Sequence, residues 1–133
     1  MFGSKKNSTP QRSIDSLIGA GTRIDGNIVF SGGLRVDGDV RGNISNENGQ
    51  EGTLVISEKA SVEGAITVGH VVINGTVIGP VCAGESLELF SSARVTGDIE
   101  YQQIEMQQGA VIQGRMVHQV SAKNVELKLA SSK

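Results

Sequence analysis

The sequence predicts an all-β fold, a right-handed parallel β-helix (solenoid) of about six windings with three short strands in each and flexible termini. Two observations support this prediction. Segments 36–44 and 73–81 share the pattern aliphatic-x-Gly-x-aliphatic-x-Gly-x-aliphatic. A period of two indicates strands whose alternate side chains face opposite sides, and the glycines let the chain bend between them. The second observation is that this glycine-centred motif recurs along the chain.

The repeat is defined by six glycines whose spacing is 16, 22, 15, 18 and 17 residues: Gly26, Gly42, Gly64, Gly79, Gly97 and Gly114. The step of 22 contains the polar, turn-rich segment 45–52 (SNENGQEG), and removing a loop of about five residues restores the period. An eleven-residue pattern of two short strands joined by a bend occurs at 54–64, 87–97 and 104–114. Such short units must stack to bury their apolar faces.

The extent of the repeat divides the chain into three parts. They are a flexible N-terminal tail (1–15), a β-helix (16–119) and a short C-terminal tail or partial extra winding (120–133). A left-handed β-helix is the alternative, but it requires sustained hexapeptides. The six-residue step is kept from Ile18 to Val36 and then meets Gly42. The general preference for right-handed crossovers therefore decides the predicted hand.

Composition excludes several classes of protein. The net charge of −2 combines both signs, so no strong field attracts nucleic acid. The single cysteine, Cys82, cannot form an intramolecular disulfide and fits a reducing compartment. The chain has neither an apolar run of about 20 residues that could span a bilayer nor the apolar centre of a signal peptide. These features predict a cytoplasmic protein.

Little in the sequence indicates catalysis, and no catalytic, cofactor-binding or metal-binding residues are expected. His70 and His118 are the only histidines, and isolated surface residues are the favoured interpretation. Metal sites need clustered ligands, and no phosphate-binding loop motif is present. The alternative is an acyltransferase-like enzyme on a left-handed β-helix with a histidine base, but the insertion 45–52 has no histidine or lysine. A secreted sugar-binding β-helix is disfavoured by the lack of a signal peptide and of aromatic platforms.

Two apolar residues, Val29 and Ile78, break the alternation and are expected to point outward. They are either isolated surface residues, which are common, or a lateral contact with a partner. The alternating charges at Asp37, Asp39 and Arg41 indicate a solvated outer face that also discourages sideways association.

Three features together resemble the bactofilin family of bacterial polymer-forming cytoskeletal proteins. They are the glycine-centred turns, the opening Leu-Ile-Gly-Ala-Gly at 17–21, and the leading sequence MFGSKK at 1–6. The resemblance extends from Met1 to about Gln119. It implies a structural, non-enzymatic protein that forms non-polar filaments without nucleotide. It also implies a tail that touches the inner face of the cytoplasmic membrane, and scaffolding of cell-wall or morphogenesis proteins that control cell shape.

The membrane-binding residues expected in the tail are Met1, Phe2, Lys5 and Lys6. The apolar pair would insert into the lipid boundary, and the lysines would be attracted to anionic lipid. Myristoylation is not the route, because glycine is at position 3 rather than 2.

The homopolymer is expected to form through the two ends of the β-helix. A β-helix leaves one winding of unpaired backbone N–H and C=O groups at each end, and no amphipathic helix is available to cover them. The predicted polymerisation contacts are Ile18 and Ile24 at one end and Ile112, Met116 and Val117 at the other.

Overall fold

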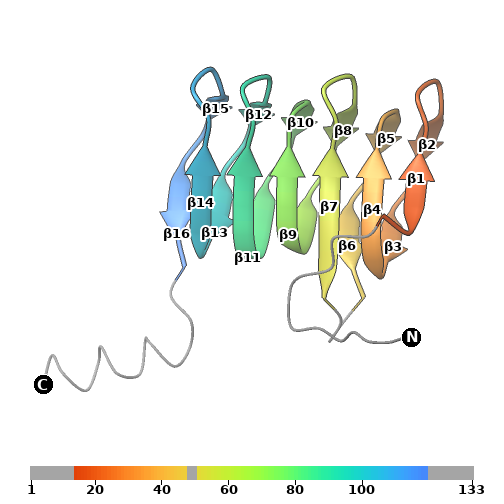
Figure 1. Cartoon of the computed structure of the whole chain (residues 1–133), viewed down its shortest axis with the longest axis horizontal. Helices are drawn as coiled ribbons and strands as arrows, with labels where there is room; N and C mark the ends of the chain where they lie inside the picture. The colour runs from red at the N-terminus through yellow and green to blue at the C-terminus, as the bar shows by residue number, and fades with distance from the viewer. Residues whose placement is uncertain (1–13, 48–50, 120–133) are drawn as a thin grey trace, which may run out of the picture.

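The computed structural model describes residues 14–47 and 51–119 and shows sixteen strands and no helix in this part of the chain (Figure 1). The predicted flexible tail, apart from residues 14 and 15, and the predicted partial winding in 120–133 lie outside the described residues. All strand pairs are parallel and join successive windings, so the strands lie side by side along a rod. The predicted parallel β-helix of six windings is confirmed.

Each winding contributes one strand segment to each of three faces. The first face contains β1 (Ser16–Ile18), β4 (Gly32–Val36), β7 (Gly52–Ile56), the second parts of β9 (Ile66–Ile73) and β11 (Val81–Leu89), and β14 (Gln103–Met106). The second face contains β2 (Arg23–Asp25), β5 (Asp39–Arg41), β8 (Ser61–Glu63), β10 (Thr76–Ile78), β12 (Arg94–Thr96) and β15 (Val111–Gln113). The third face contains β3 (Ile28–Phe30), β6 (Ile44–Asn46), the first parts of β9 and β11, β13 (Ile99–Tyr101) and β16 (Met116–His118).

The core is a set of aliphatic columns that run along the rod. Val36, Val40 and Ile44 each lie on a different face of the second winding and are all 0% exposed. Their partners in the third winding, Ile56, Val62 and Ile66, are also buried. No polar or charged side chain is buried among the described residues. Burial of these side chains stabilises each winding by roughly 1.5–3 kcal/mol per residue.

The corner between the second and third faces is built from the six glycines that define the sequence repeat. All six have positive φ angles between 139° and 156°, which L side chains rarely adopt. A Cβ atom added to Gly42 would lie 2.0 Å from the carbonyl oxygen of Gly26 in the winding before it. The backbones therefore approach closely at this corner, and the glycine alignment made from the sequence is confirmed.

The corner between the first and second faces has two forms. Short corners at Gly38 and Gly75 occur in the second and fourth windings, and the other four windings have four-residue turns at 19–22, 57–60, 90–93 and 107–110. The longer turns form the loops at the ends of β1, β7, β11 and β14 (Figure 1). The turns at 57–60, 90–93 and 107–110 are the predicted bends of the eleven-residue pattern.

The corner between the third and first faces accommodates the insertion predicted at 45–52. The chain leaves β6 at Asn46 and enters β7 at Gly52, and residues 48–50 between them lie outside the described residues. In the two following windings β9 and β11 run through this corner as continuous strands, and β11 has a register shift between Ala83 and Ser86. The insertion therefore occupies one corner and leaves the stacking of the windings intact.

Side-chain oxygens next to the glycine corner bind the backbone of the following winding. Oδ1 of Asn27 accepts from the Asn43 N–H at 2.9 Å, and Oδ1 of Asn43 accepts from the Ala65 N–H at 2.9 Å. At the end of the rod, Oδ1 of Asp98 accepts from the Arg115 N–H at 2.9 Å. This hydrogen bond, assisted by the charge of the Arg115 guanidinium, lowers the pKa of Asp98 below its ordinary value of 3.8.

Acid should therefore weaken the attachment of the last winding. A carboxylate with a lowered pKa in the folded state contributes stability above pH 3.8, and this contribution is lost as the pH falls through the folded-state value. Asp98→Asn keeps an acceptor oxygen and removes the charge. We expect this variant to show a smaller loss of Tm between pH 5 and pH 3 than the wild type. An equal loss in both proteins would contradict a role for this carboxylate.

Candidate assembly surfaces

The two terminal windings have unpaired strand edges. Among the described strands, β1, β2 and β3 each pair on one side only, and so do β14, β15 and β16. Every other described strand pairs on both sides. The unpaired N–H and C=O groups of an edge strand can pair with strands of another chain. Each end of the rod therefore presents three strand edges to a second copy.

The last winding exposes apolar side chains that continue the core columns. Met106 stacks on Leu89 and is 45% exposed, and Met116 stacks on Ile99 and is 44% exposed. Ile104 and Ile112 lie in the same winding and are partly buried. The residues at the equivalent positions of the inner windings are buried. The four side chains of the last winding therefore form an unfinished core at this end.

The first winding is more closed than the last. Ile18 and Phe30 are each 8% exposed, and Ile24 and Ile28 are partly buried against the core. The Phe30 ring reaches inward, close to Gly52 at the start of the third winding. The two ends therefore differ in how much apolar surface they expose.

The predicted polymerisation contacts fall into two groups. Ile18 and Ile24 lie in the first winding, and Ile112 and Met116 lie in the last, all four within the core columns. Val117 is different, because it pairs with Glu100 on the outer side of the third face and is 40% exposed. Sequence reasoning did not select Ile28 or Met106. Aligning them with Ile44 and Leu89 in the repeat would have identified them.

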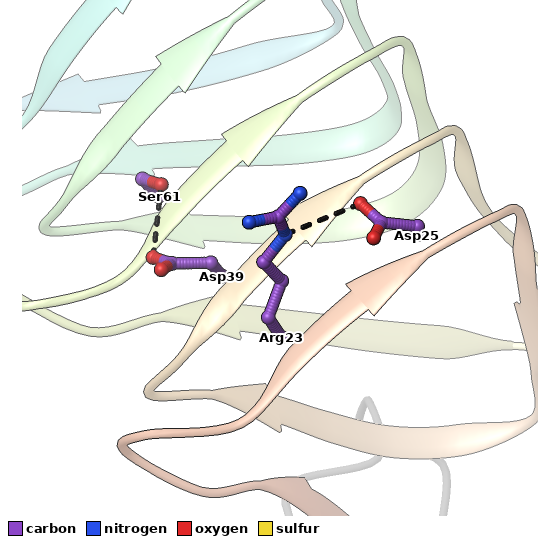
Figure 2. A network of polar contacts seen from close by, with 4 residues as sticks. All are labelled: Arg23, Asp25, Asp39 and Ser61. Carbon is purple, nitrogen blue, oxygen red and sulfur yellow. Dashed lines mark hydrogen bonds and ion pairs between the residues drawn. The ribbon is translucent and has the colours of Figure 1, made fainter.

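The outer side of the second face is polar in the first windings. On the outer side of the second face, Arg23 pairs with Asp25 at 3.3 Å, and Ser61 donates to Asp39 at 3.1 Å (Figure 2). These groups are exposed, so each contact contributes roughly 0–1 kcal/mol. Their main effect is to keep this face hydrated, as the alternating charges in the sequence predicted.

The apolar residues on the sides of the rod are scattered. Val29 is 66% exposed and Ile78 is 48% exposed, so both point outward as predicted. Val29 lies on the third face and Ile78 on the second, whereas Leu17, 60% exposed, lies on the first. These three residues do not form one apolar patch, which favours their interpretation as isolated surface residues.

The residues considered for chemistry lie apart from one another. His118 donates its Nε2–H to the carbonyl oxygen of Gln102 at 2.9 Å and packs beside Tyr101 on the third face. His70 lies on the first face, with Nδ1 2.9 Å from the Ser86 hydroxyl. Cys82 is half-buried with Sγ 3.8 Å from a Glu100 oxygen, and burial together with the Glu100 charge raises its thiol pKa. A raised pKa makes this thiol a weak nucleophile at neutral pH.

The expected membrane-binding residues Met1, Phe2, Lys5 and Lys6 lie outside the described residues. Within the described ranges, no helix is present that has the length and apolar character needed to cross a bilayer.

Comparison with known proteins agrees with this architecture. A family model named Bactofilin and described as polymer-forming cytoskeletal matches residues 16–117. Bactofilin BacO of Myxococcus xanthus (strain DK1622) is 32% identical over 102 residues, which cover 77% of this chain and 78% of that protein. Bactofilin BacP of the same organism is 32% identical over 97 residues, or 71% of this chain. The chain covers only 40% of the length of BacP.

No solved structure matches the chain significantly. The family match covers all six windings and both candidate assembly ends, and it identifies a structural protein rather than an enzyme. The chain belongs to the bactofilin family of polymer-forming cytoskeletal proteins.

Proposed function

We propose that this chain forms non-polar filaments without nucleotide, by pairing its first windings with each other and its last windings with each other. The main supporting observation is the unfinished core at the last winding, where Met106 and Met116 are 45% and 44% exposed. Ile112 lies beside them, and Ile18 and Ile24 supply the contact at the other end. Val117 borders the contact from the outer side.

The difference between the two ends favours like-with-like pairing. In an isologous contact the same surface meets itself, so a closed end and an open end can each be self-complementary. Two such contacts that alternate along the rod produce a filament in which successive subunits have opposite directions. Such a filament has no polarity and needs no energy source to maintain a direction.

Assembly without nucleotide is tested by electron microscopy of the purified full chain. The protein is dialysed against EDTA and treated with a phosphatase that destroys residual nucleotide. We expect filaments whose abundance is unchanged by ATP or GTP. Filaments that form only after nucleotide is added would contradict the proposal.

The tail residues Met1, Phe2, Lys5 and Lys6 are proposed to attach the filament to anionic membrane on its cytoplasmic side. Burial of the two apolar side chains and attraction of the two lysines together supply about 5–8 kcal/mol before ordering costs. One tail therefore binds weakly, whereas a filament that presents many tails binds firmly through avidity.

We expect Phe2→Glu to remove most co-sedimentation with liposomes that contain anionic lipid, because it replaces the inserting side chain with a charge that the lipid repels. Filament formation should be unchanged in the same protein. Thr9→Glu places the same charge further along the tail and should keep most of the binding. Pelleting of Phe2→Glu at the wild-type level would contradict insertion, and full binding by a variant that cannot polymerise would contradict avidity.

A membrane-attached filament is further proposed to scaffold cell-wall or morphogenesis proteins. This role depends on attachment of the filament to the membrane. Cells that carry Phe2→Glu should therefore keep their filaments but no longer concentrate cell-wall synthesis at one place. Labelling of newly made cell wall in cells that carry only the variant tests this expectation. Normal labelling in cells whose Phe2→Glu protein is shown to be detached from the membrane would contradict the scaffolding role.

A further inference from the structure

Stacking of the windings brings together three metal-ligating side chains that are far apart in the sequence. Glu51, His70 and Glu85 each place a ligand atom within 4.8 Å of the others. They belong to the third, fourth and fifth windings, at the corner between the third and first faces. We propose that these residues bind one Zn²⁺ ion per chain.

The local structure explains why these side chains converge. Glu51 ends the inserted segment just before β7, and Glu85 lies in the register shift of β11 between Ala83 and Ser86. Gly69 lies between them, and the Cγ atom of Glu85 would be only 3.8 Å from a Cβ atom added at this glycine. The side chain of Glu85 therefore lies close over Gly69, in the winding to which His70 belongs.

The histidine is held in a suitable orientation. Its Nδ1 atom is 2.9 Å from the hydroxyl oxygen of Ser86. In the tautomer whose Nδ1–H donates to that oxygen, Nε2 keeps the lone pair that can bind a metal ion. A hydrogen bond to the other ring nitrogen is the usual way in which a metal-binding histidine is fixed. His70 is half-buried, so its ring has less freedom than that of an exposed residue.

The charges also favour a divalent cation. Two carboxylates neutralise a +2 ion, and Glu85, Glu88 and Glu105 line the groove next to the site. The described residues that line this groove include no lysine or arginine. One imidazole with two carboxylates is a donor set that suits Zn²⁺ better than the all-oxygen sets of Mg²⁺ or Ca²⁺.

The distances need only a small adjustment. Ligand atoms that bind Zn²⁺ at about 2.1 Å in a tetrahedral arrangement are about 3.4 Å apart. Both glutamates are exposed and have rotatable side chains, so they can close this gap without moving the strands. A bound ion would then link three successive windings at this corner.

Isothermal titration of the full chain with ZnCl₂ after removal of metal by EDTA tests the site. We expect one Zn²⁺ per chain, at least tenfold weaker binding in His70→Ala and in Glu85→Gln, and a Tm increase of about 5 °C in the wild type with excess Zn²⁺. Glu85→Gln changes an exposed side chain and keeps its size, so the fold should be retained. Circular dichroism verifies this.

Two control variants separate this site from other zinc ligands. His118→Ala removes the other histidine, and Cys82→Ser removes the thiol. Both should bind Zn²⁺ as the wild type does. The proposal is overturned if the wild type does not bind Zn²⁺ at a concentration of ~100 μM, which is well above the dissociation constant expected of a three-ligand site. It is also overturned if His70→Ala binds as tightly as the wild type, or if either control abolishes binding.

Discussion

Replacing Gly64 with alanine should lower the free energy of unfolding by about 3–5 kcal/mol and can prevent folding altogether. Gly64 has a φ angle of 150°, which disfavours any side chain. The added Cβ atom would also lie 2.1 Å from the carbonyl oxygen of Gly42 and 2.5 Å from its carbonyl carbon. The obstacle is backbone of the preceding winding, so relief requires the two windings to separate at this corner.

A matched variant, Gly84→Ala, distinguishes this cause from a general effect of losing a glycine. Gly84 lies within β11. The atom nearest to a Cβ added there is the Cα atom of Gly69 at 3.8 Å, which is an ordinary contact. We expect Gly84→Ala to change the free energy of unfolding by less than about 1 kcal/mol. Urea denaturation followed by circular dichroism measures both variants. Equal destabilisation of the two would contradict the proposed role of the corner.

Replacing Met116 with arginine should shorten filaments strongly, with at least about a tenfold loss in the association constant of that end. Met116 continues the core column of Ile99 and is 44% exposed at the open end. In the proposed contact it would be buried against a second copy, where an unpaired guanidinium is costly to desolvate. The isolated rod should keep most of its stability, because Met116 lies in the last winding and is already 44% exposed there.

Filament length in electron micrographs and sedimentation velocity measure this effect. Ile78→Arg is the control, because Ile78 is 48% exposed but lies on the side of the rod in the fourth winding. It should leave filament length unchanged. Val117→Arg should shorten filaments less than Met116→Arg, because Val117 lies on the outer side of its strand. If the Met116→Arg filaments were as long as those of the wild type, the last winding would not be the contact surface.

Much of the fold could be predicted because its signals are local. Alternation of aliphatic residues and glycines at short spacing specifies both strand and corner, and the six aligned glycines do lie at one corner. Alternation also carried enough information to assign Val117 to the outer side, since it aligns with Glu100 next to Ile99. That alignment was not extended to the last winding, so Met116 and Val117 were treated alike.

Other features depend on how windings stack, which local patterns do not specify. Gly69 and Gly84 resemble corner glycines, yet β9 and β11 pass through these positions as continuous strands. The approach of Glu51, His70 and Glu85 follows from the insertion and the register shift together. Neither the length of a loop nor the place of a bulge can be read from the period of the repeat. His70 therefore had the sequence signature of an isolated residue.

One-sided pairing of the terminal windings makes the ends of the rod the places where unfolding starts. Each winding pairs only with its immediate neighbours, so opening begins at a free end and proceeds one winding at a time. Every separate rod has two free ends, whereas a filament of many rods has only two in total. In the proposed end-to-end filament most fraying ends become interior segments, so each contact should slow amide exchange in the two terminal windings that it joins. Subunits inside such a filament should then unfold more slowly than the two subunits at its ends.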